Sequence, residues 1–180
     1  MFPAVFTIFI HFSGDRACIK DYVFIDPACG SGNFLTETYL SLRRLENDIL
    51  RILTYGQISF GDAIHSPIQV SIRQFYGIEI NDFAVTVAKT ALWIAESQML
   101  KETEEIVRVP LDFLPLKTYT NITEGNALRL DWESVVPKSK LSYIMGNPPF
   151  IGYSLYLKLA SYYNSPDHST KGTPSHFNVL

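Results

Sequence analysis

The 180-residue sequence has only two cysteines, Cys18 and Cys29. They lie too far apart for a CxxC pair, and two cysteines are too few for a zinc-finger set, so we predict no metal site. So low a cysteine content also argues against a disulfide framework of the kind found in small secreted domains. We therefore expect a reduced, cytoplasmic setting.

Basic residues and long apolar runs are also scarce. Lys and Arg number 15 against 18 Asp and Glu, giving a net charge of −3, so the chain lacks the basic excess expected of a complete DNA-binding protein. Residues 1–12 are apolar, but the run is short, contains Pro3 and has no basic start, so it fits neither a signal peptide nor a membrane span. What remains, 47% hydrophobic and 18% charged residues, is typical of one folded domain.

Short apolar runs alternate with segments of helical periodicity. The predicted strands cover residues 22–25, 75–80, 121–124 and 141–145, and the predicted helices cover residues 33 to about 53 and 83–99. Strands that alternate with helices indicate an α/β fold with a parallel sheet and flanking helices. Ligands of such sheets bind at the carboxyl ends of the strands.

Side-chain patterns within these segments give further expectations. The first helix is expected to bury Leu35, Tyr39, Leu42, Leu45, Ile49 and Leu53, and the second Val87, Ala91, Ile94 and Ala95. Ile68, Val70 and Ile72 alternate, which suggests another short strand. Residues 101–117 carry charges and two prolines and are expected to form a connection. Past Ser154 no element is recognisable.

A glycine-rich turn follows the first predicted strand, in the order Asp26-Pro27-Ala28-Cys29-Gly30-Ser31-Gly32-Asn33-Phe34. Gly30 and Gly32 allow a tight turn and a close approach of the backbone to a ligand. The helix that follows aims free N–H groups at that ligand, which suits a carboxylate or another anionic group. The stretch matches neither the P-loop nor the GxGxxG pattern. Its alternative interpretation is a tight turn with no ligand.

Two polar strand ends follow along the chain. Glu79 ends the second strand and can accept hydrogen bonds from a ribose diol. It follows Gly32 by 47 residues, more than the roughly 20 of a compact dinucleotide fold, which implies an insertion around residues 55–66. Asn126 and Ala127 follow the third strand and could line the adenine end of a nucleoside pocket. The alternatives are an exposed carboxylate for Glu79 and a simple turn for Asn126-Ala127.

The fourth strand runs into Asn147-Pro148-Pro149-Phe150. Two prolines fix the backbone and remove its donors, so that carbonyl groups can face a ligand. Asn147 adds a side-chain acceptor, and Phe150 offers a flat apolar surface for a base. Two acceptors that grip the N–H bonds of an aromatic amine would localise its lone pair for attack on a methyl donor. The alternative is a structural turn.

The four motifs DPACGSGNF, YGIEIN, GNALRLDW and GNPPF, in this order, resemble those of adenine-specific DNA methyltransferases. These enzymes are S-adenosylmethionine-dependent and have the class I, Rossmann-like fold. The residues of the four motifs are especially similar to those of large restriction–modification methyltransferases, including enzymes fused to their own nuclease. The resemblance covers about residues 24–154.

The resemblance implies a role for each motif. Asp26 and the Gly30–Gly32 turn would hold the methionine part of the cofactor, Glu79 the ribose hydroxyls, and Ile80 would lie against the adenine. Asn126 stands where relatives often have Asp, but its carbonyl can still accept a hydrogen bond from the cofactor's adenine. Asn147 and the Pro148 carbonyl would grip the target amine, and Phe150 would stack on the flipped base. The remaining cofactor-motif residues are Pro27, Ala28, Cys29, Asn33, Phe34 and Ala127, and Pro149 completes the catalytic motif.

The same resemblance implies an incomplete domain. The family's helical segment before the first strand, its later strands and its target-recognition domain are not recognisable here, and a truncation or frame change would explain this. We therefore divide the chain into an N-terminal extension (residues 1–21), a partial catalytic domain (22–154) and an irregular tail (155–180). Double-stranded DNA, bound through the missing recognition region, is the expected substrate, with a restriction or specificity subunit as a partner and no membrane.

Two alternatives remain open at this point. The Asn-Pro-Pro-aromatic grip suits any planar amine or amide, so RNA adenine or a protein glutamine could replace DNA adenine. The chain could also be an inactive remnant, and by itself we expect it to be inactive. Methylation of a cytosine ring carbon is disfavoured because that chemistry uses a cysteine, usually after proline, and neither Cys18 nor Cys29 follows one.

Overall fold

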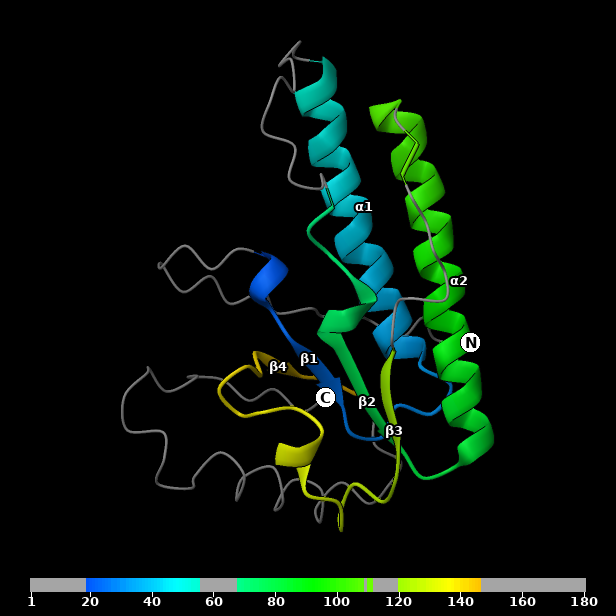
Figure 1. Ribbon diagram of the computed structural model, residues 1–180, viewed down its shortest axis with the longest axis vertical. Helices are drawn as coiled ribbons and strands as arrows, with labels where there is room; N and C mark the ends of the chain where they lie inside the picture. The colour runs from blue at the N-terminus through cyan, green and yellow to red at the C-terminus, as the bar shows by residue number, and fades with distance from the viewer. Residues whose placement is uncertain (1–18, 56–67, 109, 112–119, 147–180) are drawn as a thin grey trace, which may run out of the picture.

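The computed structural model describes residues 19–55, 68–108, 110–111 and 120–146. Four parallel strands form one sheet in the order β3-β2-β1-β4 (Figure 1). The strands are β1 (Phe24–Asp26), β2 (Phe75–Glu79), β3 (Asn121–Glu124) and β4 (Tyr143–Ile144). The predicted α/β fold with a parallel sheet is confirmed, and all four predicted strand positions hold, with β4 shorter than expected.

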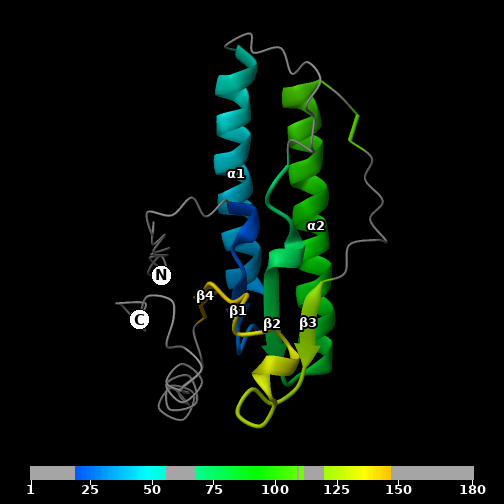
Figure 2. The same ribbon diagram turned by 60° about the vertical axis from the view of Figure 1, so that its left-hand side comes forward.

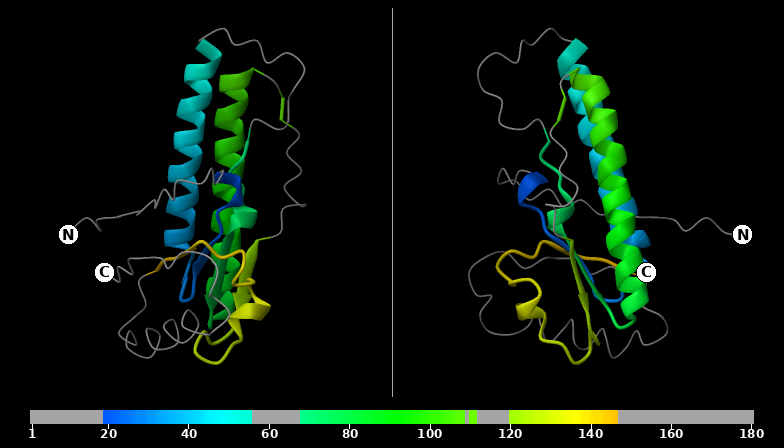
Figure 3. Two further views of the ribbon diagram at one scale, coloured as in Figure 1. Left: turned by 90° about the vertical axis from the view of Figure 1, so that its left-hand side faces the viewer. Right: turned by 45° about the vertical axis from the view of Figure 1, so that its right-hand side comes forward.

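Two long helices cover one face of the sheet. They are α1 (Asn33–Tyr55) and α2 (Asp82–Val107), and they pack against each other along their length (Figure 2 and the left view of Figure 3). Asn81 caps α2, its side chain accepting the Ala84 N–H, and Arg108 ends it in the left-handed conformation. In the part of the chain that the structure describes, neither helix carries an apolar stretch that could span a bilayer.

The buried side chains form two clusters, one on each face of the sheet. Phe24 and Phe75 belong to the larger cluster, with residues of α1 and α2. Ile25 and Ile78 point the other way and pack on Trp132 and its neighbours, in and around η3 (Trp132–Ser134). The Phe24 ring stacks on Phe75 and on Tyr143, at centroid distances of 4.9 and 5.2 Å, and so joins β2, β1 and β4.

The predicted helix stripes are partly wrong. Leu45 and Ile49 of α1 and Ile94 of α2 are exposed. The contact between the two helices instead includes buried polar side chains, and the Thr103 hydroxyl of α2 accepts from Arg43 and donates to Asn47 of α1. An apolar pattern alone does not reveal such a seam.

Two further element predictions are wrong. Residues 68–71 form no strand, and the capping box of Ser71 and Gln74 starts the short helix η2 (Ile72–Gln74). The connection expected at residues 101–117 begins later, because α2 continues to Val107. The insertion expected at residues 55–66 and the tail beyond Ser154 lie outside the described residues, apart from Tyr55, the last residue of α1.

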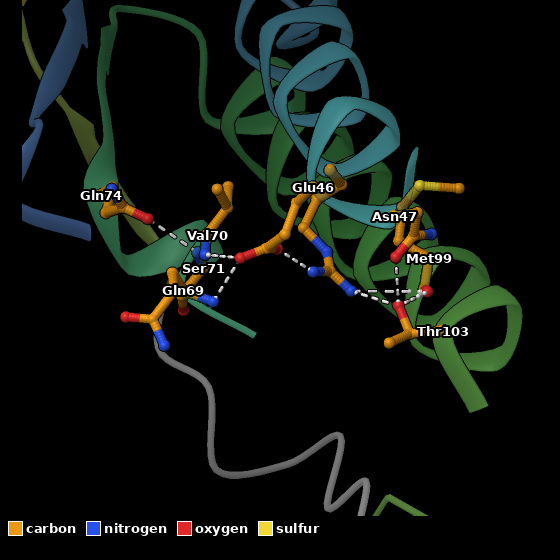
Figure 4. A network of polar contacts seen from close by, with 9 residues as sticks. Glu46, Asn47, Gln69, Val70, Ser71, Gln74, Met99 and Thr103 are labelled. Atoms are coloured by element: carbon orange, nitrogen blue, oxygen red, sulfur yellow. Dashed lines mark hydrogen bonds and ion pairs between the residues drawn. The ribbon is translucent and has the colours of Figure 1, made fainter. Parts of the chain in front are cut away.

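A buried polar network ties the helices to the chain that enters β2 (Figure 4). Arg43 forms an ion pair with Glu46 and donates to Thr103 Oγ1 at 2.7 Å. The other oxygen of Glu46 accepts the N–H groups of Gln69 and Val70, at 2.5 and 3.3 Å. The Gln74 amide, close by, donates to the carbonyls of Ile19 and Tyr22, at the start of the described chain. The segment that leads into β2 is therefore fixed from both sides.

Candidate functional site

The carboxyl ends of the four parallel strands lie along one edge of the sheet. Asp26 and Glu79 are the last residues of β1 and β2, while Gly125-Asn126 and Met145-Gly146 directly follow β3 and β4. The structure thus brings together strand ends that are spread over positions 26 to 146 of the sequence. This is the edge at which parallel α/β sheets bind their ligands.

The turn after β1 is held by backbone hydrogen bonds. The Cys29 N–H donates to the Ile78 carbonyl at 3.1 Å, and the Gly32 N–H donates to the Cys29 carbonyl at 2.8 Å. Gly32 has a φ of +80°, and a side chain there would lie 2.9 Å from the Ala88 Cβ of α2. Gly30 has a φ of +53°, and a side chain there would meet no atom within 4 Å. Gly32 is thus needed for packing, whereas Gly30 faces open space.

Glu79 joins the end of β2 to this turn. Its Oε2 accepts the Gly30 N–H and its Oε1 accepts the Asn81 N–H, each at 2.9 Å. A carboxylate oxygen has two lone pairs, so each oxygen keeps one acceptor position beyond these backbone bonds. Glu79 is only half-buried. It is therefore an oriented acceptor at the rim of the open space beside Gly30.

Asp26 lies deeper, with 1% of its surface exposed. Its Oδ1 accepts the Ala28 N–H at 3.0 Å. Burial raises the pKa of the Asp26 carboxyl to about 7; the Ala28 N–H opposes this shift and the charge of Glu79 adds to it. The same burial, with Asp26 and Glu79 nearby, raises the pKa of the Cys29 thiol to about 12. Cys29 is therefore a neutral thiol near pH 7, which argues against a role as a nucleophile.

The other predicted cofactor residues surround this pair. Pro27 is buried, Ala28 half-buried, and Asn33 and Phe34 form the first turn of α1. Ile80, directly after Glu79, is 66% exposed, so its side chain is accessible at the site. Asn126 Oδ1 accepts the Leu128 N–H at 2.9 Å, and the Ala127 carbonyl accepts the Trp132 indole N–H at 2.8 Å. The Asn126 side chain therefore stabilises its own turn, and its carbonyl oxygen keeps one lone pair that can accept a further hydrogen bond.

Two glycines at the site had been given no role from the sequence. A side chain at Gly77, within β2, would lie 2.8 Å from both Cys29 Sγ and Ile122 Cδ1. A side chain at Gly146, after β4, would lie 2.5 Å from Asp26 Oδ1. A glycine inside a predicted buried strand is a recognisable signal of a close approach, so Gly77 could have been singled out. The contact of Gly146 with Asp26 depends on the strand order and could not.

The predicted catalytic residues Asn147, Pro148, Pro149 and Phe150 lie outside the described residues. They directly follow Gly146, which belongs to the assembled edge. Among the residues that the structure describes, no three His, Cys, Asp or Glu side chains are grouped so as to hold a metal ion.

Comparison with known proteins gives consistent matches. The family model described as the MmeI DNA-methyltransferase domain matches residues 14–160. DNA methyltransferase A of Bacillus subtilis is 48% identical over 132 residues, which cover 72% of this chain and 15% of that protein. The adenine-specific methyltransferase PglX of Streptomyces coelicolor is 32% identical over 71 residues, covering 39% of this chain and 5% of that protein.

A solved structure, that of the type IIL restriction-modification enzyme MmeI in complex with DNA, is also similar. The match has a TM-score of 0.64 and 41% identity, and covers 72% of this chain and 17% of that one. The chain thus spans less than a fifth of the length of each of these proteins. The parallel α/β sheet is the Rossmann-like methyltransferase fold, and the chain belongs to the MmeI DNA-methyltransferase domain family.

Proposed function

We propose that the chain forms the S-adenosylmethionine pocket and catalytic loop of a restriction–modification enzyme that methylates the exocyclic amine of adenine in DNA. The observation that carries the proposal is the convergence of Asp26, Gly30 and Glu79 at the edge where β4 leads into Asn147-Pro148-Pro149-Phe150. The names of two relatives support the substrate: one is an adenine-specific methyltransferase, the other a restriction-modification enzyme solved with DNA.

The residues at this edge fit the proposed cofactor. S-adenosylmethionine carries a positive sulfonium, an amino-acid end and a ribose, and when bound it supplies the transferable methyl group. The spare acceptor positions of Glu79 suit the two ribose hydroxyls. Asp26 and Glu79 together place two carboxyl groups beside the turn, which suits a positively charged ligand. The open space beside Gly30 and the start of α1 suit the amino-acid end.

The catalytic loop, Asn147-Pro148-Pro149-Phe150, would bind the target base. Asn147 Oδ1 and the Pro148 carbonyl oxygen would each accept one N–H of the adenine amine. Holding both bonds orients the nitrogen lone pair, and both acceptors interact more strongly as the nitrogen becomes positive. Phe150 would stack on the base after it leaves the duplex. No covalent bond between enzyme and base is needed, which agrees with the neutral thiol of Cys29.

A comparison of substrates tests the proposal. The chain, extended with the remaining segments of the Bacillus subtilis relative, is incubated with tritiated S-adenosylmethionine and either duplex DNA, RNA of the same sequence or a glutamine-containing peptide. We expect label in DNA only. Label in RNA or in the peptide instead would assign the same fold to the alternative substrate. No label in any substrate, with the cofactor bound, would contradict the assignment of the Asn147 loop.

A further inference from the structure

We propose that Asp26 and Gly146 form a pair that couples cofactor binding to the end of β4, which leads into Asn147, with Gly146 as a positioning residue. The inference rests on the proposed function of the site. It concerns a contact between the last residue of β1 and the residue that precedes Asn147, two positions 120 residues apart in the sequence.

The end of β4 is fastened to its neighbours up to Met145. The Met145 N–H donates to the Ile25 carbonyl at 2.9 Å, which continues the ladder between β4 and β1. The Met145 sulfur lies 3.4 Å from the Thr38 hydroxyl of α1. The direction in which the chain leaves the sheet is therefore decided at the next residue, Gly146.

The Asp26 carboxyl group occupies the space that a side chain at position 146 would need. A Cβ on Gly146 would lie 2.5 Å from Asp26 Oδ1 and 3.3 Å from Oδ2, closer to Oδ1 than any non-bonded contact allows. Gly146 also has a φ of +145°, which residues with side chains rarely adopt. The absence of a side chain at this position thus lets the carboxyl group and the exit of β4 lie against each other.

Asp26 has little freedom to yield. Its side chain is short, almost fully buried, and anchored by the Ala28 N–H at 3.0 Å. Since the carboxyl group and Gly146 lie against each other, even a small ligand-driven shift of Asp26 changes the packing on Gly146. A shift at Gly146 conversely displaces Asp26, and Asn147 follows Gly146 directly in the chain. The two halves of the site are joined by this contact.

The test compares the full chain with its Gly146→Ala, Asp26→Ala and double variants. Melting temperatures come first. We expect Asp26→Ala to raise the melting temperature more in the Gly146→Ala background than in the unaltered chain, because it empties the space that the added methyl group needs. This holds even if Gly146→Ala alone does not fold, since the double variant should then recover the fold. If the changes in melting temperature were additive, or if the double variant did not recover the fold, the proposed contact between Asp26 and position 146 would be overturned. Backbone strain at Gly146 would then be the remaining explanation.

Cofactor binding is then measured by calorimetric titration with S-adenosylmethionine. We expect Gly146→Ala to weaken binding about tenfold, the effect of one lost polar contact. Glu105→Ala is the control: Glu105 is exposed near the C-terminal end of α2, away from the strand ends, so affinity should hold. Unchanged affinity in a folded Gly146→Ala variant would overturn the coupling.

Hydrogen exchange of the amides of residues 143–146 gives an independent reading. Cofactor should slow this exchange in the unaltered chain but not in the folded Gly146→Ala variant, and equal slowing in both would overturn the coupling. If the unaltered chain bound no cofactor, the proposed function would fail instead, while the melting temperatures would still decide whether a side chain at position 146 clashes with Asp26.

Discussion

Glu79 Oε2 accepts the backbone N–H of Gly30 at 2.9 Å, and this bond joins the end of β2 to the turn after β1. Its other oxygen accepts the Asn81 N–H, so both carboxylate oxygens receive a backbone donor. The side chain therefore has two tasks: it fixes the turn, and it keeps acceptor positions for a ligand. A glutamine has one oxygen and one NH₂ group, so it can serve only one of the two donors.

Glu79→Ala and Glu79→Gln should both weaken S-adenosylmethionine binding, by about 1–3 kcal/mol, because polar partners are left unpaired. Glu79→Gln should not restore the affinity, since the glutamine NH₂ group would face one of the two backbone N–H donors. Glu124→Ala is the matched control, because Glu124 pairs with Glu79 in register but is exposed at the end of β3. Calorimetric titration is the measurement. Equal affinity of the three variants and the unaltered chain would remove Glu79 from the site.

Asp26→Asn should stabilise the chain at pH 8 more than at pH 4. Burial raises the pKa of Asp26 to about 7, so between pH 4 and 7 the folded chain holds a proton that the unfolded chain has lost. Stability contributed by the protonated carboxyl is thus present below pH 4 and lost as the pH rises through 7. Asn does not titrate and escapes this loss. Thermal melting at both pH values tests it, with the exposed Asp21→Asn as a control; equal shifts at pH 4 and 8 would refute it.

Gly77→Ala should lower the free energy of unfolding by about 1–3 kcal/mol, the usual cost of overpacking a core. The added methyl group would press on Cys29 Sγ and on Ile122, each 2.8 Å away. Gly125→Ala, with its nearest neighbour at 3.4 Å, should cost much less. Urea denaturation of both variants decides the matter. Equal losses of stability in the two variants would contradict the tight packing around Gly77.

Arg43→Met should cost about 3–5 kcal/mol of stability, because it leaves Glu46 buried without its cation. The same change removes a donor from the Thr103 hydroxyl. Arg44→Met is the control, since Arg44 is the next residue of α1 and is exposed. Urea denaturation should separate the two variants clearly. Similar stabilities would mean that the buried network contributes little.

The positions of the strands and the order of the site could be predicted from the sequence. Each apolar run ends at a motif, and parallel strands must bring these ends to one edge, so Asp26, Glu79 and Asn126 were expected to meet. Helix burial was predicted less well. Leu45 and Ile49 fit the apolar period of α1, yet they are exposed, while Arg43 and Asn47 are buried and hydrogen-bond to Thr103 of α2. Arg43 and Thr103 are 60 residues apart in the chain, so their pairing leaves no local signal.

The contacts of the glycines show the same limit. Gly30 and Gly32 were identified as a turn, but the packing of Gly32 on Ala88 depends on how α2 crosses the turn. Likewise, Ile68, Val70 and Ile72 alternate as a strand would, but the mutual hydrogen bonds of Ser71 and Gln74 favour the short helix η2. The hydrogen bonds of a local capping box thus determine the structure here, and the alternation of three apolar residues does not.

The identity of the methylated base tests the proposed function most directly. The chain, extended with the remaining segments of the Bacillus subtilis relative, is supplied with duplex DNA and labelled S-adenosylmethionine, and the nucleosides are analysed by mass spectrometry. We predict adenine methylated on its exocyclic amine, a near-complete loss of turnover in Asn147→Ala, and weaker capture of the base in Phe150→Ala, by about 1–3 kcal/mol, than in Phe150→Trp. Methylcytosine as the product, or full turnover by Asn147→Ala, would contradict the proposed mechanism.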